Sequence, residues 1–321
     1  PEAPGGATRH GYFTTSGGLP LMAHLHGGAA ERGVAALIVA PFGWEDVCSY
    51  RPRRELARRL AGDGIPALRF DAPGVGDSAG DASLPGRVDA WIDAVARAAD
   101  ALRAETGCAR VVAVGIGPGG LVAGHAMLAG ARIDGAVLWP GVGRGRQFVR
   151  EMAALRRLER QEYTAGGDDD GTVAGFLADD AFREALAALD LTGALVSRSL
   201  TGARVLAMGR DGIPPDARLV EALRGAGAGV ETDDGAGYGQ LMADPQVARM
   251  SSDASARIAR FCLDVGDDLP AAAVAAVLRP SATVAEGVEE HPVELAAGHE
   301  GREVGADRAD RPVGDELEQI G

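Results

Sequence analysis

Short runs of apolar residues alternate along this chain with longer amphipathic stretches, and this alternation limits the possible folds more than any other feature. The first run is Val34 to Ala40, and the second is Ile65 to Phe70. Continuous apolar runs of this length are typical of strands that are buried on both faces of a parallel sheet. Between them, Leu56 and Leu60 repeat at helical spacing. The segment therefore predicts a strand, a helix and a second strand.

The same pattern recurs further along the chain. It predicts helices over Val88 to Arg103, Pro118 to Leu128, Ala217 to Arg224 and Pro245 to Leu263, and strands over Arg110 to Val114, Gly135 to Trp139, Arg204 to Met208 and Gly229 to Thr232. Alternation of this kind predicts an α/β fold with a doubly wound, mostly parallel sheet and helices on both faces.

The alternation stops between residues 143 and 199, where two amphipathic stretches flank a run of Gly and Asp. We interpret this segment as an inserted helical cap. The predicted domains are a core over 8–142 and 200–264, the cap over 143–199, and an acidic tail over 265–321. The tail has a second interpretation, because VEEHPVELAAGHEGREV is spaced like the opening GYFTTSGGLPLMAHLHG and could begin a truncated second copy of the domain.

Composition excludes several classes of function. The formal net charge is -14, which argues against nucleic acid as a partner, because clustered cations supply most of the affinity for phosphate backbones. The three cysteines Cys48, Cys108 and Cys262 lack the spacing of a zinc site or a disulfide framework. No apolar run is long enough to span a bilayer. We expect a cytoplasmic protein with no metal, no cofactor and no membrane contact.

Two motifs resemble a known superfamily. The segment LRFDAPGVGDSAG at 68–80 ends a strand with Asp71 and a glycine-rich turn, and APFGWEDVCSYRP at 40–52 precedes it. Together they resemble the α/β-hydrolase superfamily, in the branch of serine aminopeptidases and exosortase-associated hydrolases, over roughly residues 9 to 263. The resemblance implies the α/β-hydrolase fold, and it implies that Phe42, Gly43 and Trp44 belong to an oxyanion loop that lines the pocket.

In this superfamily the nucleophilic serine lies at the centre of a G-x-S-x-G turn between a strand and a helix. The matching segment here is RVVAVGIGPGGLVAG, with Gly115 and Gly119 as flanking residues and Gly117 at the centre. Gly117 has no side-chain oxygen to attack a carbonyl carbon. The next residue, Pro118, has no backbone N–H to donate to an oxyanion. The sequence therefore predicts that ordinary serine hydrolysis is absent.

The other triad positions are only partly filled. The resemblance places the triad acid at Asp211, just beyond a predicted strand, and the triad base near Tyr238, where the sequence has no histidine. His125 lies two turns into the helix after Gly117, where we expect a structural imidazole. A triad needs all three roles filled, and this chain fills one. Asp211, Tyr238 and Glu45 are the candidate catalytic residues.

Two alternatives concern the same region. The segment GIGPGG also satisfies G-x-G-x-x-G through Gly115, Gly117 and Gly120, which is the pattern of a dinucleotide-binding turn. Such a turn usually follows the first strand of a fold, whereas here several strands precede it. Cys48 is a second candidate nucleophile, although a lone cysteine is more often a small core residue.

Two main functions remain open. One is an atypical enzyme that isomerises, epimerises, cyclises or eliminates a small molecule or peptide in a capped apolar pocket, without an acyl-enzyme. The other is a catalytically inactive binding protein with a protein partner. A third, hydrolysis through an unrecognised nucleophile, also remains.

Overall fold

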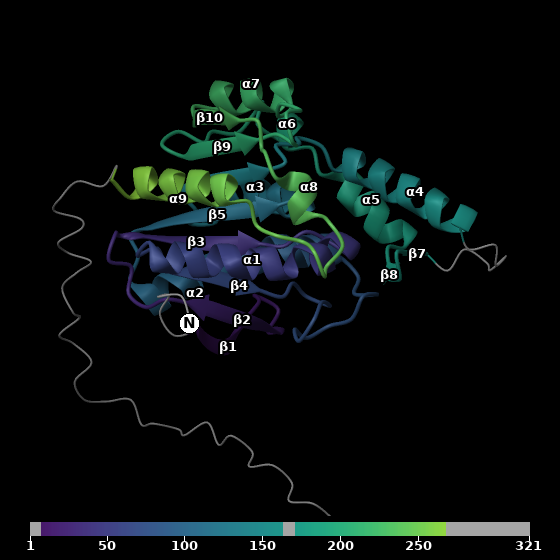
Figure 1. Ribbon diagram of the computed structural model, residues 1–321, viewed down its shortest axis with the longest axis horizontal. Helices are drawn as coiled ribbons and strands as arrows, with labels where there is room; N and C mark the ends of the chain where they lie inside the picture. The colour runs from purple at the N-terminus through teal and green to yellow at the C-terminus, as the bar shows by residue number, and fades with distance from the viewer. Residues whose placement is uncertain (1–7, 163–170, 268–321) are drawn as a thin grey trace, which may run out of the picture. The chain divides into compact units, whose positions relative to one another are not determined.

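The structure is a computed structural model that describes residues 8–162 and 171–267. One eight-stranded sheet runs through it, with helices on both faces (Figure 1). The strand order is β1-β2-β4-β3-β5-β6-β9-β10. This arrangement confirms the predicted doubly wound, mostly parallel sheet.

The strands of this sheet are β1 (Thr8–Thr14), β2 (Pro20–His26), β3 (Val34–Val39), β4 (Ala67–Phe70), β5 (Arg110–Ile116), β6 (Gly135–Trp139), β9 (Arg204–Met208) and β10 (Gly229–Asp233). The helices that belong to the same body are α1 (Trp44–Gly62), α2 (Arg87–Thr106), α3 (Pro118–Leu128), α7 (Ala217–Gly225), α8 (Tyr238–Leu241) and α9 (Ser252–Asp267). In this order, β2 pairs antiparallel with both β1 and β4. All the pairs from β4 across the sheet to β10 are parallel.

The apolar runs fill two layers, one on each face of the sheet. Helices α1 and α9 pack Leu56, Leu60 and Phe261 into the layer on one face. Helices α2 and α3 pack residues such as Leu102 and Leu121 into the layer on the other face. Strand β3 is buried along its whole length, as expected for a strand covered on both sides.

The segment between β6 and β9, which we call the insertion, carries helices α4 (Gly145–Glu162), α5 (Asp180–Ala188) and α6 (Leu191–Ala194). It also carries a two-stranded hairpin of β7 (Thr172–Val173) and β8 (Phe176–Leu177), which the sequence did not predict. Gly43, at the start of α1, lies beside the hairpin, because a Cβ built on it would stand 3.6 Å from the Phe176 side chain. The insertion therefore reaches the end of the sheet where α1 begins.

The C-terminal part of the fold differs from the prediction in two places. The last helix begins at Ser252 rather than Pro245, because the Asp244 carboxylate accepts a hydrogen bond from the backbone N–H of Gln246 and stabilises a separate turn there. The helix also continues to Asp267, past the predicted boundary at residue 264, and buries Val265. Most of the predicted tail, residues 268–321, lies outside the described residues.

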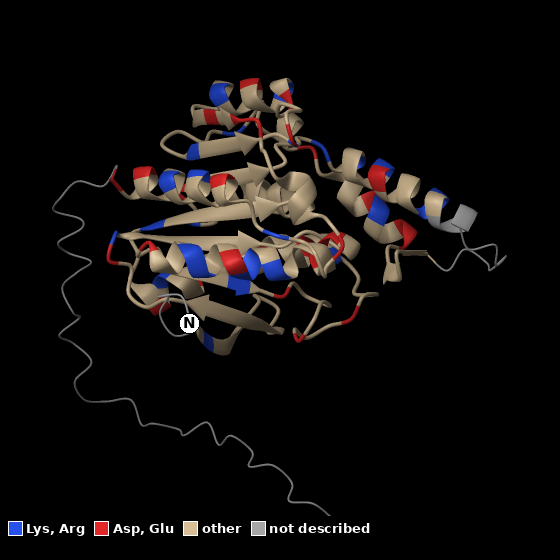
Figure 2. Cartoon of the chain, in the orientation of Figure 1, with Lys and Arg blue, Asp and Glu red and all other residues tan. Residues whose placement is uncertain are grey.

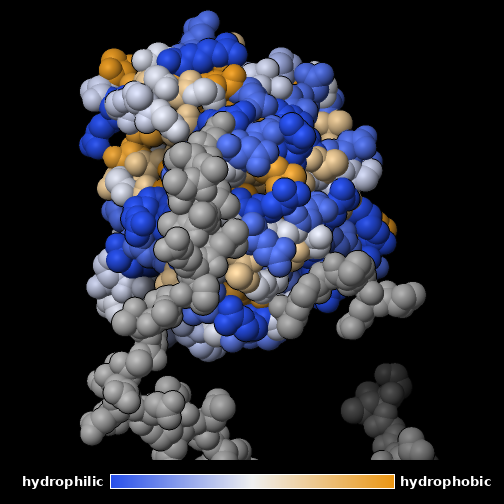
Figure 3. Space-filling view, turned by 90° about the vertical axis from the view of Figure 1, so that its left-hand side faces the viewer, coloured by the Kyte–Doolittle hydropathy of each residue, from blue (hydrophilic) through white to orange (hydrophobic). Residues whose placement is uncertain are grey.

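Charged residues mark the outer faces of the helices. In Figure 2, α1 carries both basic and acidic positions on its outer face. Arg51 pairs with Glu55 on this helix, and Arg59 pairs with Asp63 just after its end. Figure 3 shows the face at the opposite end from α4 and α5, where apolar atoms form small patches among hydrophilic residues. Within residues 8–162 and 171–267, no helix combines the length and the apolar character that a membrane crossing requires.

Candidate functional site

A sharp turn joins β5 to α3, and Gly117 stands at its centre. Its backbone has φ 57° and ψ -135°, a region that favours glycine. Its N–H donates to the carbonyl oxygen of Trp139 at 2.8 Å. The neighbouring glycines have a packing role, because a Cβ on Gly115 would overlap the backbone of α3 and a Cβ on Gly119 would overlap the carbonyl of Ala40. Small residues at 115 and 119 therefore allow α3 to follow β5 closely.

The carboxylate of Glu45 lies beside Gly117. A Cβ built on Gly117 would stand 2.7 Å from Oε2 of Glu45, 3.0 Å from Cβ of Pro41 and 3.7 Å from the hydroxyl of Tyr238. Glu45 reaches this place from the first turn of α1. Two of the three candidate catalytic residues, Glu45 and Tyr238, therefore lie beside the turn at Gly117, where a nucleophile side chain is absent.

The surroundings of Glu45 favour its neutral form. Burial and the nearby negative charge of Glu151 raise the pKa of Glu45 to about 7, while the positive charge of Arg210 opposes this rise. Carboxyl groups in solution have a pKa near 4, so this group changes its protonation state close to neutral pH. A carboxyl group of this kind can accept a proton from a bound molecule and return it.

Arg210 and Glu151 form an ion pair that the sequence analysis missed. The two Nη atoms of Arg210 each donate to one carboxylate oxygen of Glu151, both at 3.1 Å. Arg210 follows β9, and Glu151 lies on α4, so the pair joins the sheet to the insertion. A charged residue just beyond the carboxyl end of a buried strand was the available signal for Arg210. Glu151 had no signal, because a charge on an amphipathic helix is usually solvated.

Tyr238 is buried, and its ring packs edge-on against Trp139. The ring centroids are 5.7 Å apart and the ring planes meet at 66°. The Arg210 guanidinium lies 5.1 Å from the Tyr238 ring centroid. The Tyr238 hydroxyl is buried and has no hydrogen-bond partner. Burial raises the pKa of Tyr238 well above its ordinary value of 10, and the charge of Glu45 adds to this. The hydroxyl therefore keeps its proton and remains a donor at neutral pH.

Asp211 does not reach the turn at Gly117. Its two carboxylate oxygens accept hydrogen bonds from the backbone N–H groups of Gly237 at 2.6 Å and Gly239 at 2.7 Å. These two residues flank Tyr238 at the start of α8. The structure therefore brings Asp211 to the loop that carries Tyr238.

A pocket of about 300 Å³ opens beside Glu45. Its floor includes Pro118 and the predicted loop residues Phe42, Gly43 and Trp44. The insertion supplies most of its apolar wall, with Phe148, Met152 and Leu155 from α4, Leu186 from α5, and Val173 and Ala174 from the hairpin. Glu45 and Glu151 are the charged residues that line it. A volume of this size suits a small organic molecule.

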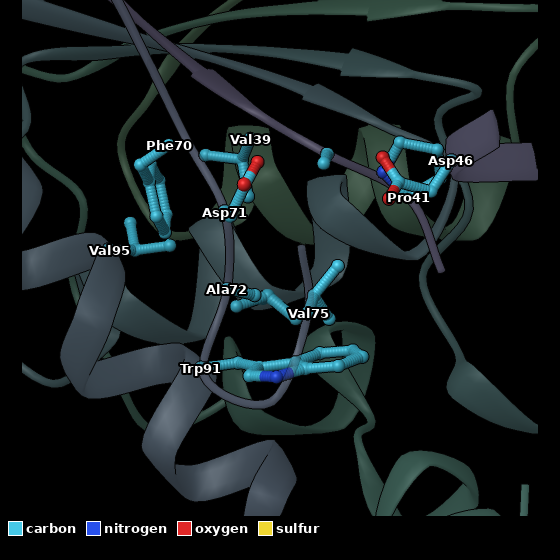
Figure 4. Close-up of a pocket in the computed structure, with 11 residues that line it drawn as sticks. Val39, Pro41, Asp46, Phe70, Asp71, Ala72, Val75, Trp91 and Val95 are labelled. Atoms are coloured by element: carbon cyan, nitrogen blue, oxygen red, sulfur yellow. The ribbon is translucent and has the colours of Figure 1, made fainter. Parts of the chain in front are cut away.

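A second cavity lies under the turn that follows Asp71 (Figure 4). Its volume is about 20 Å³, and Asp46, Asp71 and Trp91 line it together with apolar residues. This is room for about one water molecule. The Asp46 carboxylate is already paired with the buried guanidinium of Arg53. Of these two cavities, only the pocket beside Glu45 has room for a small organic molecule.

Two sequence candidates remain, Cys48 and His125. Cys48 is 1% exposed, and burial raises the pKa of its thiol, which keeps the thiol protonated and weakly nucleophilic. Burial lowers the pKa of His125, and its Nε2 has no hydrogen-bond partner. Across the described ranges 8–162 and 171–267, no three or more His, Cys, Asp or Glu side chains are grouped as metal ligands.

Comparisons with known proteins support the fold. Residues 47–161 match the serine aminopeptidase family S33. An esterase of Pyrococcus furiosus has a similar structure, with a TM-score of 0.55 and 15% identity, over 79% of this chain and 90% of the esterase. A lipase in its open form has a TM-score of 0.55 and 16% identity, over 81% of this chain and 100% of the lipase. The α/β hydrolase GrgF from Penicillium sp. sh18 has a TM-score of 0.52 and 16% identity, over 81% of this chain and 98% of that chain. No curated protein matches the sequence.

Proposed function

We propose that this chain, which has the α/β-hydrolase fold and matches the serine aminopeptidase family S33 over residues 47–161, is an atypical enzyme of that fold. It binds a small, largely apolar molecule in the pocket beside α4 and transforms it by acid–base chemistry, without a covalent acyl-enzyme. Glu45 is the general base. The insertion acts as a cap that supplies the apolar wall.

The position of the Glu45 carboxylate supports this proposal most strongly. In the superfamily the side chain of the nucleophile begins where a Cβ on Gly117 would stand, and here an oxygen of Glu45 is 2.7 Å from that point. The carboxylate therefore faces the place where a bound substrate would react. Its pKa of about 7 provides both the basic and the acidic form at neutral pH.

The absence of a hydroxyl at residue 117 and of an N–H at residue 118 argues against acyl transfer. Removing a single oxyanion donor typically lowers turnover by about 100- to 1000-fold. Proton transfer needs neither group. In the proposed step, Glu45 takes a proton from a carbon next to a carbonyl group, and the electron pair of the broken C–H bond passes into an enolate. The proton is then returned to the opposite face of the same carbon or to a neighbouring carbon, or it goes to a leaving group that departs with its bonding electrons as the new double bond forms. These outcomes correspond to epimerisation, isomerisation and elimination.

Hydrogen exchange tests this proposal without knowledge of the natural substrate. The protein is incubated in D₂O with a panel of medium-chain ketones, enones and β-keto esters, and deuterium uptake at carbon is followed by mass spectrometry. We expect uptake in at least one compound with the wild type and none above background with Glu45→Gln. Glu221→Gln, an exposed glutamate on α7, is the matched control and should behave like the wild type.

Two results would overturn the proposal. Binding of panel compounds in the pocket without exchange would instead favour an inactive binding protein. Cleavage of p-nitrophenyl esters together with a fluorophosphonate adduct would show a hydrolase with another nucleophile.

A further inference from the structure

The carboxylate of Asp211 binds the loop that carries Tyr238. Asp211 accepts from the N–H of Gly237 with one oxygen and from the N–H of Gly239 with the other. Gly237 has φ 96°, and a Cβ there would overlap the side chain of Ser251. Asp211 itself has φ 46°, an uncommon value for a residue other than glycine. The backbone on both sides of Tyr238 is therefore fixed by its surroundings.

This loop places the buried hydroxyl of Tyr238 beside the turn at Gly117. Tyr238 is 6% exposed, and its hydroxyl makes no hydrogen bond. Burying a donor without a partner is unfavourable, so such a group beside the turn at Gly117 needs an explanation. The hydroxyl and Oε2 of Glu45 stand 3.7 Å and 2.7 Å from the same point above Gly117. Both oxygens therefore lie beside the place that a Cβ of residue 117 would occupy.

We propose that Tyr238 is a positioning residue for Glu45: its hydroxyl donates a hydrogen bond to the Glu45 carboxylate when that group is ionised, and Asp211 holds Tyr238 in place for this contact. This inference rests on the proposed function, since it explains how the base is oriented. It gives Asp211 and Tyr238 roles that act through Glu45 and not on the substrate directly.

The charges around Glu45 agree with such a partner. Glu151 repels the ionised form of Glu45, while Arg210 attracts it from a distance and is itself occupied by Glu151. Among the residues that the structure describes, no hydrogen bond contributes to the pKa of Glu45. Burial keeps the Tyr238 hydroxyl protonated, so it is available to the carboxylate over the whole range in which Glu45 titrates.

The test is the titration of Glu45 by ¹³C NMR of protein labelled at the glutamate carboxyl carbons, with the Glu45 signal assigned by its loss in Glu45→Gln. A donor to the ionised form lowers a pKa, so removing it must raise the midpoint. We expect Tyr238→Phe, which keeps the ring and its packing, to raise the Glu45 midpoint by roughly one pH unit.

Asp211→Asn is the second variant, because asparagine tolerates the left-handed backbone but its amide can accept from only one of the two N–H groups. We expect a smaller rise of the Glu45 midpoint. Asp216→Asn is the matched control: Asp216 accepts from the N–H of Arg218 at the start of α7 in the same manner, and its change should leave the midpoint where it was.

An unchanged midpoint in Tyr238→Phe would overturn the positioning role. The titration needs no substrate, so it separates this inference from the proposed function. If the midpoint moves as expected and no compound exchanges deuterium, the acid–base proposal fails and the contact between Tyr238 and Glu45 stands.

Discussion

Placing a methyl group on Gly117 tests whether the Glu45 carboxylate occupies the turn. The backbone at Gly117 has φ 57° and ψ -135°, and forcing alanine into such a region costs about 2 kcal/mol. The new Cβ would also stand 2.7 Å from Oε2 of Glu45, which must move away, and neighbouring residues of this kind couple by about 1 kcal/mol. We therefore expect Gly117→Ala to lower the free energy of unfolding by about 3 kcal/mol.

A double-mutant cycle measured by urea denaturation separates the two contributions. In the Glu45→Ala background, Gly117→Ala should cost only the backbone part, about 2 kcal/mol. Gly130→Ala is the matched control, because Gly130 has φ 95° and nothing within 4 Å of a built Cβ. Its cost should be the same in both backgrounds. If the cost of Gly117→Ala is equally independent of Glu45, the carboxylate does not lie at the turn and the reasoning is wrong.

Three further predictions concern the same centre. The folded state holds the Glu45 proton more tightly than the unfolded state, so this residue contributes stability that is fully present below its ordinary pKa of 4.5 and is lost as the pH rises through about 7. The difference in unfolding free energy between wild type and Glu45→Gln, measured at pH 5 and pH 8, should show this loss, and a constant difference would contradict it. Glu151→Gln should lower the pKa of Glu45 because it removes a like charge, and Arg210→Ala should raise this pKa because it removes an opposite charge. Carboxyl titration by NMR checks both, and shifts in the same direction would contradict the assigned charges. A fluorophosphonate should leave the wild type unlabelled and label Gly117→Ser only weakly, since Pro118 supplies no N–H to the oxyanion; strong labelling of the wild type, seen by intact-mass analysis, would reveal another nucleophile.

The sequence predicted the sheet well because its strands are buried. Strands over 135–139 and 204–208 and the helix over 118–128 have the predicted bounds, since uninterrupted apolar runs between glycine, proline and charged residues leave little choice of ends. The last helix was less predictable. A carboxylate-capped turn at Asp244 breaks a stretch whose composition alone favours one long helix.

The candidate site was predicted only in part. Gly117 and Pro118 were visible from the motif, because a turn between strand and helix has a local signature. The meeting of Glu45 with Gly117 depends on packing between two loops that are far apart in the chain, and no local pattern encodes it. The same holds for the pairing of Glu151 with Arg210, which depends on where the insertion folds back onto the sheet.

The claim that the Glu45 carboxyl can both accept and donate a proton near neutral pH is tested most directly by the titration of its carboxyl carbon in the wild-type protein by ¹³C NMR. A midpoint near pH 7 is predicted from its burial and from the charge of Glu151. A midpoint near the ordinary value of 4.5 would show a solvated carboxylate at the start of α1 and would contradict the account.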